Sequence, residues 1–201
     1  MVSLEEGSLS TRSGNVVYLD DVLNMAVSKS REIIKEKSED LPNPDEVAEQ
    51  IGVGAVIFGV LYNNRIKDMT FSYSRALNFD GETGPYVQYT QARCRSLLEK
   101  CSYPDCDPDY SGVAGEEAGE VLKLLDSYPD VILSAVEKYE PCYLSRFLVD
   151  LSQAFGKFYL ACNIAKSPDA VRKARLMLVK AVRGVLADGL SLLGIQSPEK
   201  M

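Results

Sequence analysis

Apolar residues recur every three to four positions along most of the chain, a spacing that predicts amphipathic α-helices. Proline, glycine and asparagine separate these stretches and mark the helix ends. The predicted helices cover residues 20–37, 44–61, 85–100, 115–127, 129–139, 142–163 and 168–193. Residues 1–18 are expected to be irregular or short-stranded, and the weak alternation over residues 67–73 favours a short extended segment. The pattern predicts an all-α bundle of about seven helices.

Several helix ends carry specific signals. Asn43 precedes Pro44 and is expected to cap the second helix, because proline is favoured at the first helical position. Gly194 follows the last helix and suits the left-handed position just beyond a helix end. Ile195 would then pack back on Leu190 in a Schellman motif, which fixes the direction of the C-terminal residues.

Composition places the chain among globular proteins and excludes several classes. The 201 residues are 46% hydrophobic and 25% charged, which is ordinary for a folded domain. No apolar run approaches the roughly 20 residues that span a bilayer, so no membrane partner is expected. The first residues show no basic region followed by an apolar stretch, which favours a cytoplasmic protein.

The residues that usually perform catalysis are sparse. Histidine is absent, which removes the commonest general base and the commonest metal ligand. The five cysteines form no Cys-x-x-Cys pair and are expected to be free thiols, although Cys101 and Cys106 could pair if their geometry allowed. The adjacent acids at residues 20–21 and 116–117 are better explained as charges at helix N-termini than as an acid–base pair. No metal site, cofactor site or catalytic constellation is predicted.

Charge is distributed unevenly along the chain. The net charge is −7, but residues 105–140, hereafter the acidic sector, hold ten acids and two lysines and alone account for −8. The remainder is therefore +1, and residues 170–187 carry five basic residues and no acid. Such a run is usually a solvated helix face, but it could also follow phosphates. Net charge alone does not exclude a nucleic-acid partner.

One predicted helix combines aromatic and basic side chains on one face. Tyr86, Tyr89 and Arg93 are spaced i, i+3 and i+7, an arrangement that suits stacking on unpaired bases with a phosphate contact. From spacing alone, partly buried tyrosines at the edge of the core are the better explanation. Tyr159 and Asn163 lie one turn apart at the end of the long helix and could face a groove.

Ordered sequence blocks over essentially the whole length resemble the C-terminal part of arginyl-tRNA synthetases. The most specific block is FDGETGPYVQY at residues 79–89, followed by Ala92 and Arg93. The other blocks lie, in family order, at residues 9–23, 53–68, 148–162 and 193–201. Each block is weak by itself, and their joint order carries the resemblance.

The resemblance implies a DALR-type anticodon-binding domain at residues 19–201, preceded by the tail of a catalytic domain at residues 1–18. That helical domain is shared with cysteinyl-tRNA synthetase. The implied partner is tRNA(Arg), mainly its anticodon loop, and not DNA. The residues implied to contact tRNA are Tyr86, Tyr89, Arg93, Tyr159, Asn163 and Met201. The C-terminal segment with Pro198 would bring Met201 to that surface.

A remnant of the family's signature loop stands at Ser10, Thr11, Arg12, Ser13 and Gly14. The family commonly has Lys-Met where this chain has Ser8 and Leu9, and often lysine where it has Ser13. The other class I signature contains two histidines, and this chain has none. The full-length family uses ATP to attach L-arginine to tRNA. This chain alone is expected to be inactive in that reaction and to act with a catalytic domain supplied in cis. The alternative is a helical protein-interaction module that uses the acidic sector.

Overall fold

The computed structural model describes residues 2–5, 18–37 and 41–201, so the signature-loop remnant at residues 10–14 lies outside it. Within these residues the chain forms seven α-helices, one 3-10 helix and two short strands. The elements are β1 (Val2–Leu4), α1 (Leu19–Lys37), α2 (Pro44–Leu61), β2 (Met69–Phe71), α3 (Tyr73–Ala76), α4 (Gly84–Lys100), η2 (Tyr110–Val113), α5 (Glu116–Lys138), α6 (Cys142–Ala161) and α7 (Asp169–Leu192). The prediction of a helical bundle is confirmed, with a small two-stranded sheet beside it.

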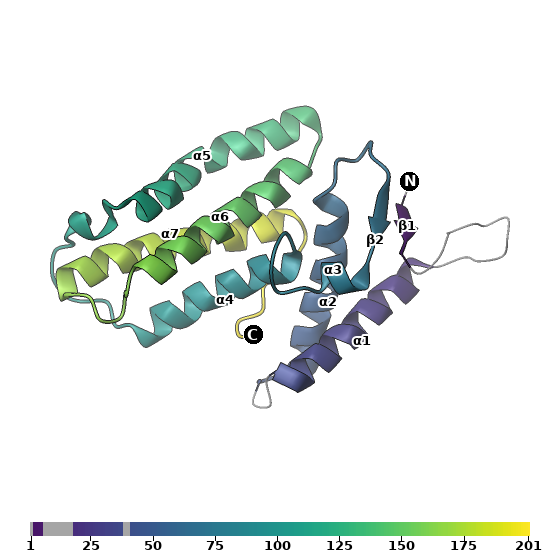
Figure 1. Ribbon diagram of the computed structural model, residues 1–201, viewed down its shortest axis with the longest axis horizontal. Helices are drawn as coiled ribbons and strands as arrows, with labels where there is room; N and C mark the ends of the chain where they lie inside the picture. Colours follow the sequence, from purple (N-terminus) through teal and green to yellow (C-terminus); the bar gives the residue numbers. More distant parts are fainter. Residues whose placement is uncertain (1, 6–17, 38–40) are drawn as a thin grey trace.

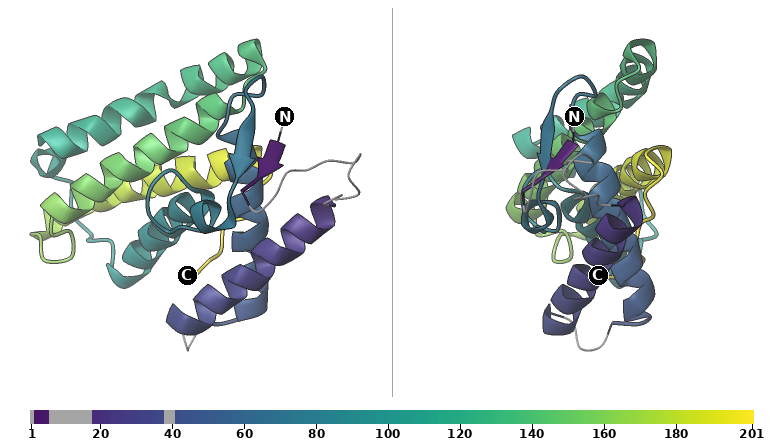
Figure 2. Two further views of the ribbon diagram at one scale, coloured as in Figure 1. Left: turned by 45° about the vertical axis from the view of Figure 1, so that its right-hand side comes forward. Right: turned by 90° about the vertical axis from the view of Figure 1, so that its right-hand side faces the viewer.

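The helices form two packed groups, which Figure 1 shows side by side. Helices α4 to α7 make a bundle, and α1 pairs with α2 beside it, next to the strands and α3. Each group has its own cluster of buried apolar residues, which we call the bundle core and the α1–α2 core. The views in Figure 2 show the same division from two further directions. Among the described residues no helix is long and apolar enough to cross a membrane.

Glycine allows both close helix contacts of α2. A Cβ on Gly52 would lie 2.7 Å from the backbone of Val27, so α1 and α2 touch along their main chains. Where α4 begins, a Cβ on Gly84 would lie 3.0 Å from the carbonyl oxygen of Gly54. Helix α2 therefore connects the α1–α2 core with the start of the bundle.

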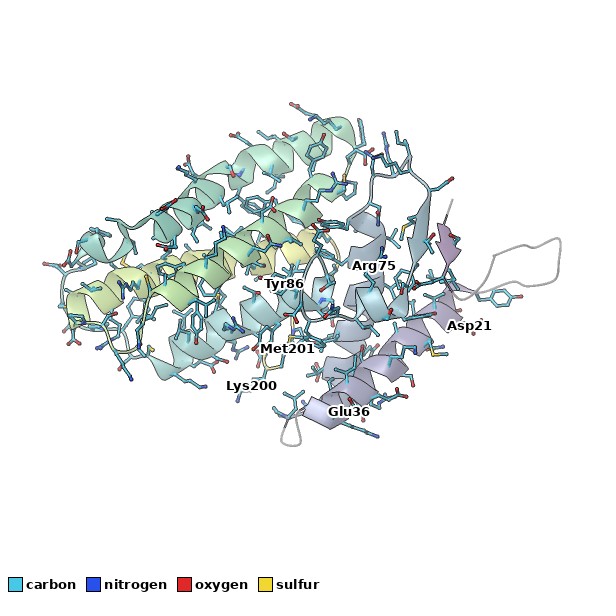
Figure 3. All side chains as sticks on the ribbon, in the orientation of Figure 1. Asp21, Glu36, Arg75, Tyr86, Lys200 and Met201 are labelled. Carbon is cyan, nitrogen blue, oxygen red and sulfur yellow. The ribbon has the colours of Figure 1, made fainter. Side chains whose placement is uncertain are left out.

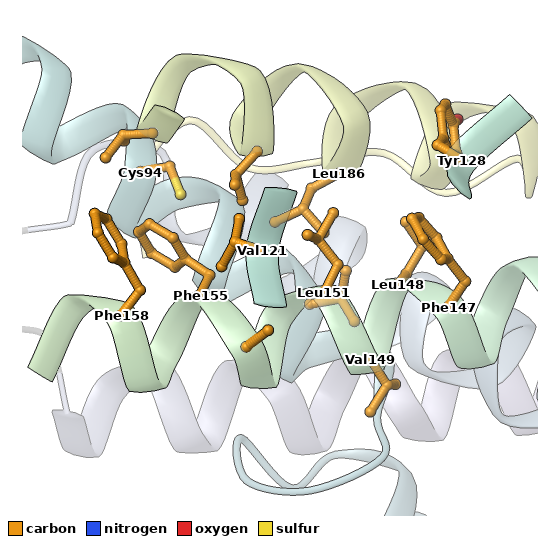
Figure 4. Packing of buried hydrophobic residues seen from close by; sticks show 14 of the residues in the cluster. Cys94, Val121, Tyr128, Phe147, Leu148, Val149, Leu151, Phe155, Phe158 and Leu186 are labelled. Carbon is orange, nitrogen blue, oxygen red and sulfur yellow. The ribbon is translucent and has the colours of Figure 1, made fainter. Parts of the chain in front are cut away.

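The bundle core is built around the aromatic and aliphatic stripe of α6. Phe155, Phe158, Leu148 and Leu151 are fully buried and Phe147 almost so, as the i, i+4 spacing predicted. Figure 4 shows these side chains pointing from α6 toward α7. All five cysteines are free thiols, so Cys101 and Cys106 do not pair.

The short strands occupy the segments where extended structure was expected. β1 and β2 pair in parallel, with Val2 opposite Met69 and Leu4 opposite Phe71. The predicted extended segment at residues 67–73 is confirmed over β2, and Tyr73 already starts the four-residue helix α3. The sequence pattern gave no signal for α3 or η2.

One predicted break is absent. The expected helices at 115–127 and 129–139 are a single helix, α5, which continues through Pro129. Tyr128, the residue before the proline, is held in place by tertiary contacts: its ring stacks on Phe147 at 5.4 Å and its hydroxyl donates to Asp188 at 2.6 Å. These contacts outweigh the local tendency of proline to end a helix.

Both predicted helix ends were tested by the structure, with different outcomes. The Schellman motif after α7 is confirmed: Gly194 has φ 74°, and the N–H of Ile195 donates to Leu190 O at 2.9 Å. Asn43 stands at the N-cap of α2, but its side chain makes no capping hydrogen bond. Its backbone is left-handed, which turns the amide toward Glu46 at 3.5 Å instead.

Candidate nucleic-acid interface

A groove of about 840 Å³ runs along α4, and we call it the α4 groove. One wall is α4, and the others come from the segment after α1, the end of α6 and the C-terminal residues. Its lining is Leu41, Pro42, Tyr89, Ala92, Arg93, Ser96, Leu97, Glu99, Lys100, Tyr159, Lys200 and Met201. Figure 3 shows Met201 and Lys200 below α4, between that helix and the end of α1 at Glu36. Four of the six predicted contact residues therefore meet here: Tyr89, Arg93, Tyr159 and Met201.

Arg93 lies between two tyrosine rings in this groove. Its guanidinium carbon is 4.6 Å from the ring centre of Tyr89 and 5.3 Å from that of Tyr159. It also donates a hydrogen bond of 3.0 Å to the hydroxyl of Tyr89. A cation over an aromatic face is stabilised by the ring quadrupole, so the three side chains hold one another in place. They join α4 to the end of α6.

A second cavity of about 480 Å³ adjoins the groove and shares four residues with it. Those residues are Leu41, Tyr89, Arg93 and Met201. The rest of its wall is mostly apolar and comes from α1, α2 and the segment before α4, with Asp80 as its acid. An apolar space with a few charged groups at its rim is the usual character of a ligand site. The groove thus continues from the bundle to the α1–α2 pair.

Two predicted contact residues lie outside the groove lining. Tyr86 is half-buried and faces α6, where a Cβ on Gly156 would lie 3.8 Å from its hydroxyl oxygen. Burial raises the pKa of Tyr86, Arg93 opposes that shift, and Asp80 adds to it. Asn163 is exposed in the turn after α6, where its side-chain oxygen accepts from the N–H of Lys166 at 3.3 Å.

The C-terminal residues are fixed against the bundle rather than frayed. Arg95 of α4 pairs with Glu199 at 2.7 Å and with Glu99 at 2.7 Å. The hydrogen bond from Arg95 holds the pKa of Glu199 below its usual value. Met201 packs against the α1–α2 core. The C-terminus therefore forms part of the groove wall.

Three of the five basic residues at 170–187 donate hydrogen bonds to backbone carbonyls. Arg172 donates to Ser167 O, Arg175 donates to Gly112 O at 3.0 Å, and Lys173 donates to Cys106 O. These carbonyls belong to the turn before α7, to η2 and to the loop after α4. These three side chains are therefore not simply solvated, because they satisfy backbone acceptors, and a contact of the basic run with phosphates stays a prediction.

The acidic sector lies away from the groove. Figures 1 and 2 show α5 along the edge of the bundle opposite α4 and the C-terminus. Its ion pair with the bundle joins Glu120 to Lys157 of α6 at 3.2 Å. The acids of α5 thus lie on the side of the molecule opposite the groove.

Comparison with known protein families gives two matches, one over the part of the chain with α1 and α2 and one over the bundle. A family model described as "DALR anticodon binding domain" matches residues 87–201, and one described as "tRNA synthetases class I (R), catalytic domain" matches residues 1–73. Arginine–tRNA ligases of Halothermothrix orenii and Clostridioides difficile are 52% and 51% identical over the whole chain, which spans 36% of each relative.

Solved structures give the same result. The arginyl-tRNA synthetase of Thermus thermophilus superposes with a TM-score of 0.91 at 34% identity, covering all of this chain and 34% of that one. The Plasmodium falciparum enzyme, at 23% identity, shares the fold with a TM-score of 0.82 over 92% of this chain and 34% of its own.

Proposed function

The chain belongs to the DALR anticodon binding domain family as found in arginine–tRNA ligases, and from this premise we propose that it binds the anticodon loop of tRNA(Arg) in the α4 groove. The observation that supports this most directly is Arg93 between the rings of Tyr89 and Tyr159. Unpaired bases stack on aromatic faces and on guanidinium planes, and this cluster offers both beside an apolar cavity.

The groove suits a looped single strand better than a duplex. Sequence-specific RNA recognition mostly uses unstacked bases of loops, because the major groove of an RNA helix is too narrow for side chains. The acidic sector on the opposite side repels phosphates that approach elsewhere. A strand that enters the groove can place bases against Tyr89 and Met201 while its phosphates remain near Lys100 and Lys200.

In the larger enzyme, binding here would contribute to the ATP-dependent attachment of L-arginine to tRNA(Arg). The match of residues 1–73 to a catalytic domain model supports a connection in cis to such a domain. ATP would be bound by the rest of that enzyme, and RNA binding by this chain would need no cofactor. The same assignment implies a cytoplasmic location.

Binding is tested with fluorescently labelled tRNA(Arg) transcript and the purified chain. We expect at least tenfold weaker binding when the seven-nucleotide anticodon loop is replaced while the stems are kept. A perfect duplex of the same length should compete poorly. Equal binding of both tRNA forms would contradict recognition of the anticodon loop.

The second candidate is a protein-interaction module that uses the acidic sector. It is favoured by exposed apolar side chains near the end of α5, where Leu133 is 58% and Val136 is 64% exposed. Glutamate or aspartate at these two positions would abolish such an interaction and leave tRNA binding intact. A chain that binds no tRNA under any salt condition would leave this candidate as the better one.

A further inference from the structure

Gln88 is a fully buried polar residue at the point where three segments meet. It lies on α4 with no exposed surface, two residues after Tyr86 and directly before Tyr89, so its side chain points to a different side of the helix. Its amide nitrogen donates to Gln50 O of α2 at 3.0 Å and to Gln196 O of the C-terminal segment at 2.7 Å. One side chain therefore joins α2, α4 and the chain after α7.

The chemistry of the amide fits these two partners. A fully buried amide needs hydrogen-bond partners, and the side-chain NH2 of glutamine is a single group with two N–H bonds, one for each carbonyl. Glutamate would offer no donor to either carbonyl, and methionine has similar length but none of the polarity. The side-chain oxygen of Gln88 has no hydrogen-bond partner among the described residues, so the nitrogen carries the polar contacts of this side chain.

The amide is packed closely against α2 at Gly54. A Cβ on Gly54 would lie 2.8 Å from the Gln88 nitrogen and 3.0 Å from Cγ2 of Ile195. The missing side chain at Gly54 thus makes room for both the amide and the first residue of the C-terminal segment. Ile195 is itself buried and follows the Schellman turn at Gly194.

What Gln88 holds is the segment that ends in the groove wall. Gln196 is five residues from Met201, which lines both cavities and packs on the α1–α2 core. Arg95, two turns along α4 from Gln88, pairs with Glu199 in the same segment. The C-terminal segment is therefore attached to α4 at two points before it reaches the groove.

We propose that Gln88 is a positioning residue for RNA binding, which touches no RNA but holds the C-terminal segment so that Met201 closes the α4 groove. The proposal rests on the proposed function for its RNA readout. It also predicts a property of the free protein: the C-terminal residues are ordered by Gln88 whether or not RNA is bound. The contact to Gln50 extends this order to α2, within the region similar to a catalytic domain.

The first test uses the free protein. Gln88→Met should speed the release of Met201 by carboxypeptidase Y about tenfold, as expected for the loss of two ordinary buried hydrogen bonds. Gly54→Ala, on α2, should have a similar effect, because its methyl group would displace the Gln88 amide. This second variant also guards against a Gln88 variant that fails to fold, since alanine favours a helix. Unchanged release in both variants would overturn the proposal.

Gln91→Met is the matched control. Gln91 is also buried on α4, and its side-chain oxygen also has no hydrogen-bond partner among the described residues. The same atoms are changed in the same helix, while both hydrogen bonds of Gln88 are kept. The control should leave the release of Met201 unchanged. Acceleration as large as in Gln88→Met would show a general loosening of α4 and overturn a specific role for Gln88.

The second test is a double-mutant cycle on binding of tRNA(Arg) transcript. Gln88→Met alone and deletion of Lys200 and Met201 alone should each weaken binding several-fold. In the chain without these two residues, Gln88→Met should have no further effect, because its action passes through the groove residues of the C-terminal segment. Additive losses would overturn the positioning role while leaving the proposed function intact. Absence of binding by the unmodified chain would instead contradict the proposed function, and the release assay would still decide whether Gln88 orders the C-terminus.

Discussion

At the level of single residues, the groove depends on contacts between helices that no local pattern contains. Arg93 and Tyr89 are neighbours on α4, but Tyr159 reaches them from α6. Both tyrosine rings are partly exposed, and each packs against Arg93. This arrangement favours function over packing as the role of Tyr89, and it makes the two roles separable by experiment.

Tyr89→Ala should weaken binding of tRNA(Arg) about 5- to 100-fold, since base stacking on an aromatic residue contributes about 1–3 kcal/mol. The melting temperature should change little, because the ring is only half-buried. Fluorescence anisotropy and a thermal melt of the same sample measure both. Tyr110→Ala, on the exposed η2, is the control and should leave both unchanged. Unfolding by Tyr89→Ala would show that the tyrosine belongs to the core.

The sequence predicted several residues that line the groove, but it did not predict the residue that holds the C-terminal segment against it. Tyr89, Arg93, Tyr159 and Met201 came from spacing and resemblance, and they converge in space. Gln88 had no signal, because a polar residue on an apolar helix face has no meaning until the carbonyls opposite it are known. Asn163 was chosen for its position at a helix end, and the turn that follows uses its side chain locally.

At the level of elements, the apolar spacing predicted the ranges of most helices, but the break that it predicted at Pro129 is absent. The ranges of α1, α2, α4, α6 and α7 follow the apolar spacing to within two residues. Pro129 misled because its local cost is overcome by the stacking and hydrogen bonding of Tyr128. Secondary-structure signals are local, whereas the continuation of the helix through Pro129 depends on the packing of α5 on α6 and α7.

Pro129→Ala should therefore stabilise the protein. Alanine restores an N–H to the helix and removes the clash of the ring with the preceding turn, gains that exceed the lost rigidity of the unfolded chain. We expect about 1–2 kcal/mol, or a rise of a few degrees in melting temperature. Pro129 is exposed, so no core contact is lost.

Gly119→Ala in the same helix is the comparison, because nothing lies within 4 Å of the added Cβ. It should stabilise by about 1 kcal/mol through helix propensity alone. A lower melting temperature for Pro129→Ala, beside a higher one for Gly119→Ala, would show that the proline shapes α5 for its contact with α6.

At the level of the whole molecule, the two packed groups correspond to different family matches. The catalytic domain model ends at residue 73 and the DALR model begins at residue 87, while α2 and α4 touch through Gly54 and Gly84. The groove lies across this junction. The sequence signals place the division at residue 18, and the exact limit of the anticodon-binding part stays a prediction.

The chain alone should not activate arginine. It spans 36% of the relatives it matches, and it contains no histidine, whereas the class I signature of the family has two. Arginine-dependent exchange of pyrophosphate into ATP should stay at the level of a sample without protein. A longer arginine–tRNA ligase under the same conditions is the positive control. Exchange above background with the purified chain would contradict the prediction.

The distribution of charge predicts a shallow salt dependence of tRNA binding. Among the residues that line the α4 groove, the cations are Arg93, Lys100 and Lys200. Each neutralised phosphate of a single strand contributes a slope of about −0.7 in a plot of log K against log salt, so three contacts give about −2. Lys200→Gln should reduce the magnitude of that slope by about 0.7, whereas Lys123→Gln, exposed on α5, changes the net charge equally and should leave the slope unchanged. A slope near −5 that both variants reduce alike would show phosphate contacts spread over the surface, and it would contradict binding centred on the groove.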